Sequence, residues 1–398
     1  MCVAAVNAQP ADSGQLSPEL LLLSRVRHHE LQQLQRQPNF TCIETVERTQ
    51  RTAATKRFQM VDTLRLEVAL VGGKELFAWP GSKKFEDTEI TDMVQRGAIG
   101  NGAFGLLARM VFEGRSATFD YRGEETLEGR PEKLVRWDYK VPRMLSGYSI
   151  RVGQRRAIVG FHGSFWVDPK SLDLRRLEKT ADDIPPELEL ASASDRVDYA
   201  RVPIGEQTFL LPSGSELRMV DLGGTESRNQ IRFTACRQYS GESVVSFADP
   251  SEESLATKEP RAVKEVEVPG GLTLTLSLET ALELKSSAVG DPVEARLHGD
   301  VKHKGRILLP KGAVVSGRIS TLQVKTEFTL LGLTFTDVAA EGLHSAVKLT
   351  LDSVLGVGRV RARTTQSRLE APRPGEGLIL VPSTQPRLMR GTLMYWRN

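Results

Sequence analysis

The chain has 398 residues, of which 40% are hydrophobic and 26% are charged, and its formal net charge is +3. A chain of this length and composition is expected to form two or three globular domains with real apolar cores. So small a net charge gives no general argument for nucleic acid binding, and no apolar run approaches the roughly 18 residues that a membrane-spanning helix needs.

The first 16 residues look like the end of a secretory signal. The small residues Val6 and Ala8 precede Gln9, as they do at a signal-peptide cleavage site. We therefore expect residues 1–16 to be either the remnant of such a signal or an ordinary disordered N-terminus. The first alternative favours export.

An amphipathic helix is predicted next. Ser17 is a good N-cap and Pro18 fits the first helical position. One helical stripe collects the apolar side chains of Leu20, Leu23, Val26, Leu31 and Leu34. Pro38 cannot continue a helix, so the helix should end before it.

After Pro38 the apolar pattern changes to a period of two. Residues 64–70 and 135–139 alternate apolar and polar side chains, which is typical of antiparallel strands with one buried face. Residues 88–112 interrupt the strands with two short helical pieces and a glycine-rich link between them. The first module, residues 17–248, is therefore predicted to be mainly β with a few helices (α+β).

Two cysteines lie in predicted strands near the two ends of this module. If the strands of Cys42 and Cys236 are its first and last, the two thiols can meet as a disulfide; two separate buried thiols are the alternative. A bridge over that length is worth roughly 4–5 kcal/mol in a loop-closure model. Such a bridge fits an oxidising compartment outside the cytosol.

A linker and a second β module complete the chain. Residues 249–265 are polar and charged and contain Pro250 and Pro260, so we expect them to form the linker. Beyond it, the leucines of residues 272–278 alternate with threonine and serine, which predicts a strand. Residues 266–398 are expected to form a smaller all-β barrel.

Motifs that carry catalysis are missing from the sequence. It contains no phosphate-binding loop, dinucleotide fingerprint, His-Glu-x-x-His, Cys-x-x-Cys or nucleophile elbow. We therefore expect no enzymatic activity, no metal site and no cofactor. The alternative is an active site assembled from residues far apart in the sequence.

The first module resembles the half-barrel fold of the LolA and RseB periplasmic proteins. The resemblance rests on residues 127–137, which suit a strand pair around a glycine turn, and on the Trp-Val-Asp hairpin pattern of residues 163–177. In that family the apolar concave face of a curved antiparallel sheet with packed helices holds or senses acyl chains. The resemblance implies that a concave face of this kind includes Leu64, Leu66, Trp79, Phe119, Tyr121, Trp137, Tyr139, Phe165 and Trp166.

The second module is similar to the C-terminal β-barrel of TrbI-type conjugation and type IV secretion proteins. The similarity lies in residues 288–296 and in the run Leu-Pro-Lys-Gly-Ala-Val-Val-Ser-Gly-Arg-Ile at residues 309–319. It implies a barrel that docks to partners, and the family's rings make a homo-oligomer through this barrel a further expectation.

These patterns lead to one functional expectation and one alternative. We expect an exported protein of the periplasm or cell envelope that binds a lipid or a lipidated partner and docks to an envelope protein through its barrel. The alternative is a scaffold of an envelope or secretion complex that binds no lipid. Neither includes nucleic acid.

Overall fold

The computed structural model describes residues 17–82, 85, 89–94, 97–100, 102–114, 116–129, 131–239, 264–355 and 372–398. The expected signal remnant at residues 1–16 and most of the expected linker, up to residue 263, lie outside the described residues. The last two linker positions belong to strand β13 (Lys264–Glu265).

Helix α1 (Pro18–Arg36) opens the first module as the sequence predicts. The Ser17 hydroxyl accepts a hydrogen bond from the Leu20 backbone N, Pro18 occupies the first turn, and the helix ends before Pro38. Two short helices, α2 (Ile90–Met93) and α3 (Leu106–Phe112), fall within the predicted interruption of the strands.

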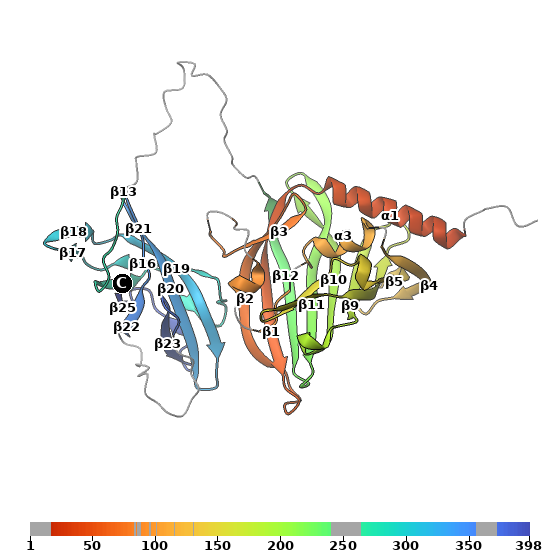
Figure 1. Ribbon diagram of the computed structural model, residues 1–398. Coiled ribbons are helices and arrows are strands. Elements are labelled where there is room, and N and C mark those ends of the chain that lie inside the picture. Colours follow the sequence, from red (N-terminus) through yellow and green to blue (C-terminus); the bar gives the residue numbers. More distant parts are fainter. Residues whose placement is uncertain are drawn as a thin grey trace, which may run out of the picture.

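Ten strands of the first module form one antiparallel sheet in the order β3-β2-β1-β12-β11-β10-β9-β8-β5-β4. The strands are β1 (Phe40–Arg51), β2 (Gln59–Val71), β3 (Lys74–Ala78), β4 (Thr118–Thr126), β5 (Lys133–Val141), β8 (Gly160–Val167), β9 (Leu174–Asp182), β10 (Leu190–Ile204), β11 (Gln207–Asp221) and β12 (Glu226–Gln238). A separate hairpin pairs β6 (Ser149–Val152) with β7 (Arg155–Ile158), and two 3-10 turns are η1 (Arg143–Leu145) and η2 (Pro186–Leu188). The sheet curls into a half-barrel, and α1 and α3 lie against it (Figure 1). The predicted fold class is confirmed.

The predicted disulfide is present. Cys42 on β1 and Cys236 on β12 are bonded across a sequence separation of 194 residues. The two strands are neighbours in the sheet, with Thr41 opposite Arg237. The bridge therefore ties the first strand of the sheet to the last in sequence, and it encloses nearly all of the first module.

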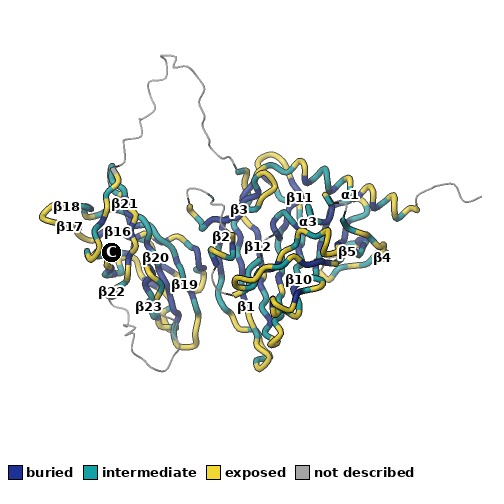
Figure 2. The backbone as a smooth tube through the Cα atoms, viewed as in Figure 1, coloured by how far each residue is buried: buried dark blue, intermediate teal, exposed yellow. Residues whose placement is uncertain are grey.

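In the described residues of the second module, all regular secondary structure is β. Nine strands form its main sheet, with order β13-β21-β20-β19-β16-β14-β25-β22 and β23 paired to β20. Beside β13 these are β14 (Thr273–Leu278), β16 (Pro292–Leu297), β19 (Val314–Val324), β20 (Phe328–Ala340), β21 (Leu343–Ala346), β22 (Thr350–Val354), β23 (Gly377–Pro382) and β25 (Leu393–Arg397). Two small pairs join β15 (Leu282–Glu283) to β24 (Arg387–Leu388) and β17 (Val301–His303) to β18 (Arg306–Leu309). Buried positions concentrate in the strands of both sheets, and the turns between strands are exposed (Figure 2).

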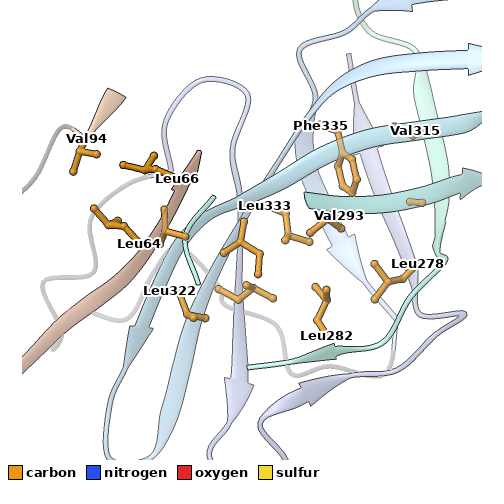
Figure 3. Close-up of a cluster of buried hydrophobic side chains, with 14 of the residues drawn as sticks. Leu64, Leu66, Val94, Leu278, Leu282, Val293, Val315, Leu322, Leu333 and Phe335 are labelled. Atoms are coloured by element: carbon orange, nitrogen blue, oxygen red, sulfur yellow. The ribbon is translucent and has the colours of Figure 1, made fainter. Parts of the chain in front are cut away.

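The two modules share one apolar core. Leu64 and Leu66 of β2 lie in the same cluster of buried side chains as Leu322 of β19 and Leu333 of β20 (Figure 3). Strand β3 pairs only with residues 67–71 of β2, and the second module pairs with the stretch of β2 before them. There the Arg65 N donates to the Val289 O and the Val289 N donates to the Thr63 O, both at 2.8 Å. The contact covers backbone groups that an exposed sheet edge would leave unpaired.

Gly290 makes this junction possible. Its φ is +102°, and a Cβ there would lie 2.2 Å from the Arg65 carbonyl oxygen and 2.7 Å from the Trp79 ring. Only glycine combines that backbone conformation with so close an approach. The adjacent Asp291 forms an ion pair with Arg65. Residues 289–291 are thus shaped to hold the second module against β2.

Candidate functional site

The register of the ten-stranded sheet aligns a continuous row of side chains across its concave face. From β2 to β4 the row consists of Leu64, Val46, Ile231, Ser215, Val197, Leu177, Phe165, Trp137 and Tyr121. Directly opposed residues on neighbouring strands point to the same face. Four of the candidate ligand-binding residues therefore lie on one face although they come from four strands far apart in the sequence.

Five aromatic residues at one end of this face form the aromatic cluster: Phe119, Tyr121, Trp137, Tyr139 and Phe165. The rings of Trp137 and Phe165 stack at 5.4 Å, and the Tyr121 and Phe119 rings meet them edge-on at 5.6 and 5.9 Å. Trp137, Tyr139 and Phe165 are buried, but Tyr121 remains 43% exposed. The cluster therefore has one open end, at β4.

A glycine lets the buried hydroxyl group of Tyr139 reach a hydrogen-bond partner. The Tyr139 hydroxyl reaches across β8 and donates to the Glu178 carbonyl oxygen at 2.7 Å. It crosses at Gly163, where a Cβ would lie 1.9 Å from that oxygen. Burial raises the pKa of Tyr139, so its hydroxyl stays protonated and remains a donor.

Helices α1 and α3 cover the aromatic cluster. Phe112 of α3 meets Phe165 edge-on at 5.2 Å, and α1 contributes the buried apolar side chains of Leu23, Val26 and Leu34 to the same core. In the described part of the chain, none of the three cavities that we characterise is lined by a residue of the aromatic cluster. The concave face is therefore filled by the protein's own helices.

Polar contacts also hold α1. The buried carboxyl group of Glu30 accepts a hydrogen bond from the Leu174 N at 3.1 Å, and His29 contacts Asp173 at 3.2 Å. Burial is the main cause that raises the pKa of Glu30 to about 8, with the nearby Asp173 adding to it. Glu30 is therefore mostly neutral at physiological pH.

Two further buried carboxyl groups lie between the sheet and α3. Glu75 accepts hydrogen bonds from the backbone N of Gly102 at 2.6 Å and of Gly105 at 2.8 Å, just before α3. Glu44 on β1 is fully buried, and burial followed by the charge of Glu75 raises its pKa to about 8. The sequence analysis missed Glu44, although it occupies a core position in the alternation Phe40, Cys42, Glu44, Val46, which was the available signal.

The remaining candidates lie elsewhere. Trp166 follows Phe165 in β8 and so points to the opposite face, where its ring lies 5.4 Å from the guanidinium of Arg136 and its indole N donates to Glu125. The expectation that it belongs with the concave face is wrong for this reason. Trp79 follows β3 and lies at the junction of the modules. Leu64, at the β2 end of the row described above, also reaches this junction, and Leu66 is fully buried in the shared core. A ligand-binding role for any of the nine residues stays a prediction.

Metal sites and membrane-spanning helices were also considered for the residues that the structure describes. Among them, no group of three or more histidine, cysteine, aspartate or glutamate side chains is placed to hold a metal ion. Within the same residues, no helix is both long enough and apolar enough to cross a membrane.

Comparisons with solved structures find distant structural likeness. No family model and no curated protein matches the chain. A crystal structure from Vibrio parahaemolyticus, assigned as an outer membrane lipoprotein-sorting protein domain, aligns with 53% of this chain and 92% of its own, at a TM-score of 0.30 and 11% sequence identity. A likeness at this level carries no functional argument, and no comparison supports the expected TrbI-type module, which stays a prediction.

Proposed function

We propose that the chain is an exported cell-envelope binding protein without catalytic activity, which binds an acyl chain on the aromatic cluster in place of α1. The second module docks the protein to an envelope partner. The Cys42–Cys236 disulfide supports the exported location, because such bridges persist in oxidising compartments. The observation that carries the binding role is the thin cover of the cluster: α1 has 19 residues, yet its buried apolar side chains are only Leu23, Val26 and Leu34.

The energies make an exchange between helix and ligand feasible. Burying three aliphatic side chains is worth roughly 5–9 kcal/mol at about 1.5–3 kcal/mol each. An acyl chain that buries about ten methylenes at about 0.8 kcal/mol each gains a similar amount. An acyl chain can therefore replace α1 on the aromatic cluster at little net cost, entering beside the exposed edge of Tyr121.

The first test uses displacement of a fluorescent fatty-acid analogue by oleate. The substitution Tyr121→Arg should weaken oleate binding roughly tenfold, because the charge must be desolvated at the mouth of the site. The control Met144→Arg adds the same charge at a side chain that is 88% exposed and lies outside the cluster, so it should leave binding unchanged. Equal affinities in the two variants would contradict the proposed entry point.

A second test exploits the competition between α1 and the ligand. Val26→Ala removes about two methylene equivalents from the cover, roughly 1.6 kcal/mol, so oleate should bind about tenfold more tightly while the protein becomes less stable. The control Val315→Ala truncates an equally buried valine of the second module and should lower stability without tightening oleate binding. Unchanged oleate affinity in Val26→Ala would show that α1 does not compete with the ligand.

The alternative function is a scaffold that binds no lipid. Two features favour it: the concave face is filled by packed side chains, and residues 289–291 pack closely against the first module. Both features make the protein rigid, and a rigid protein can bind partners through its outer surface. It predicts no displacement of the fatty-acid analogue and a partner captured by crosslinking in the envelope.

A further inference from the structure

A cavity lies at the junction of the two modules, away from the aromatic cluster. Its volume is about 280 Å³, and both modules line it: Leu64 and Trp79 belong to the first, Val289, Arg318 and Arg373 to the second. At roughly 30 Å³ for each water-sized volume, the space suits a molecule of about nine or ten non-hydrogen atoms. Junctions of this kind are frequent places for small-molecule sites.

The cavity contains a cation, Arg318, that has no acidic partner among the residues that the structure describes. Arg318 of β19 lies with its guanidinium 5.1 Å from the centre of the Trp79 ring, and among the described residues no carboxylate is within ion-pairing distance of it. Burial lowers the pKa of Arg318, because the charged guanidinium loses contact with water in this cavity. A cation–π contact of this kind uses none of the guanidinium N–H groups as donors to an oxygen, so these groups can bind a ligand.

The acids around the cavity are already engaged. Asp62 pairs with Arg48 at 2.6 Å, and Asp92 pairs with Arg151 at 3.1 Å. Glu376, close behind the wall, accepts hydrogen bonds from the Thr321 hydroxyl at 2.7 Å and from the Arg373 backbone N at 3.2 Å. Arg373 also lines the cavity, and its charge is close enough to lower the pKa of Glu376. Since these acids are occupied, the open space beside Arg318 favours a negative group.

We propose that this cavity binds a small organic anion, a carboxylate or a phosphate monoester with a short carbon skeleton. Arg318 grips the anionic group with its parallel N–H donors, a geometry that matches the oxygens of carboxylate and phosphate. The aliphatic side chains of Leu64, Val289 and Leu322 line the same cavity and contact the carbon skeleton. Because its walls come from both modules, the bound anion stabilises the junction as well.

The test uses the full-length protein and compares ligands of similar size that differ in charge. Thermal unfolding is followed with hexanoate, butyl phosphate, inorganic phosphate or hexylammonium at equal ionic strength, and affinities come from calorimetry. At least one organic anion should raise the unfolding midpoint, and hexylammonium should not. Equal shifts with hexanoate and hexylammonium, or no shift with either organic anion, would overturn the proposal. Inorganic phosphate acting as strongly as butyl phosphate would overturn the role of the carbon skeleton.

Variants test whether the organic anion binds in this cavity. Arg318→Gln should weaken binding of the organic anion at least tenfold, and Arg318→Lys should fall between the two, because lysine keeps the charge but not the paired donors. Arg306→Gln, at an exposed arginine of the same module, is the control and should bind as the wild type does. Binding that survives Arg318→Gln but is lost in Tyr121→Arg would place the anion at the aromatic cluster and refute the junction site. The two proposals can therefore fail separately.

Discussion

The docking of α1 should depend on pH through Glu30. This carboxyl group is buried, its pKa is about 8 in the fold, and its ordinary value is 4.5. A pKa raised by folding means that the folded state holds the proton over this interval and the unfolded state does not. The contribution of Glu30 to the free energy of unfolding is therefore present in full at low pH and is lost as pH rises through 4.5 toward 8.

The magnitude follows from the two pKa values. Between about pH 5 and pH 9 the proton linkage of Glu30 lowers the free energy of unfolding by about 4 kcal/mol. Glu30→Gln removes this titration. The free energy of unfolding of the variant, minus that of the wild type, should therefore rise by about 4 kcal/mol over the same interval.

Chemical denaturation at the two pH values measures this difference, and a control on the same helix isolates it. Glu19, in the first turn of α1, has a pKa lowered by the hydrogen bond with Ser17 and then by its own backbone N–H, from an ordinary value of 4.5. It is mostly ionised in both states from pH 5 upward, so the difference between Glu19→Gln and wild type should change little with pH. A difference for Glu30→Gln that is equally flat would refute the reasoning about its burial.

Two further predictions concern the disulfide and the close packing at Gly290. Replacing Cys42 and Cys236 with alanine should lower the free energy of unfolding by up to about 5 kcal/mol, as the loop-closure cost of 194 residues requires, and denaturation with and without reductant checks this. Gly290→Ala should separate the modules, seen as a larger radius of gyration and two unfolding transitions, because the new methyl group meets Arg65 and Trp79. Gly305→Ala is its control, since that glycine also has a positive φ, of +77°, but has no atom within 4 Å of the added carbon. Compact scattering from Gly290→Ala would contradict the role of Gly290 in docking.

Much of the first module could be predicted because its signals are local. The Ser17 cap and Pro38 bound α1, and the two-residue alternation along β2 and β5 identifies the buried face of each strand. The Cys42–Cys236 pairing was harder, because it depends on which strands are neighbours. It could be proposed because the first and last strands of a curled sheet can close on each other.

The rest depends on contacts between residues far apart in the sequence. Trp166 was placed on the wrong face because two adjacent aromatic residues hide the two-residue period, and only the pairing of Phe165 with Trp137 fixes which ring points inward. Gly290 looks like an ordinary turn glycine until Trp79 and Arg65 are brought against it. The junction cavity was equally invisible, because Arg318 and Trp79 are separated by more than half of the chain.

Quenching of Trp137 by a brominated fatty acid tests the central claim most directly. Trp137 stacks on Phe165 beneath α1, so a brominated acyl chain bound in the proposed place would contact its indole. We predict quenching of the wild type that is largely lost in Trp137→Phe and retained in Trp396→Phe, which removes a buried indole of the second module. Quenching that is absent from the wild type, or unaffected by Trp137→Phe, would contradict an acyl site on the aromatic cluster.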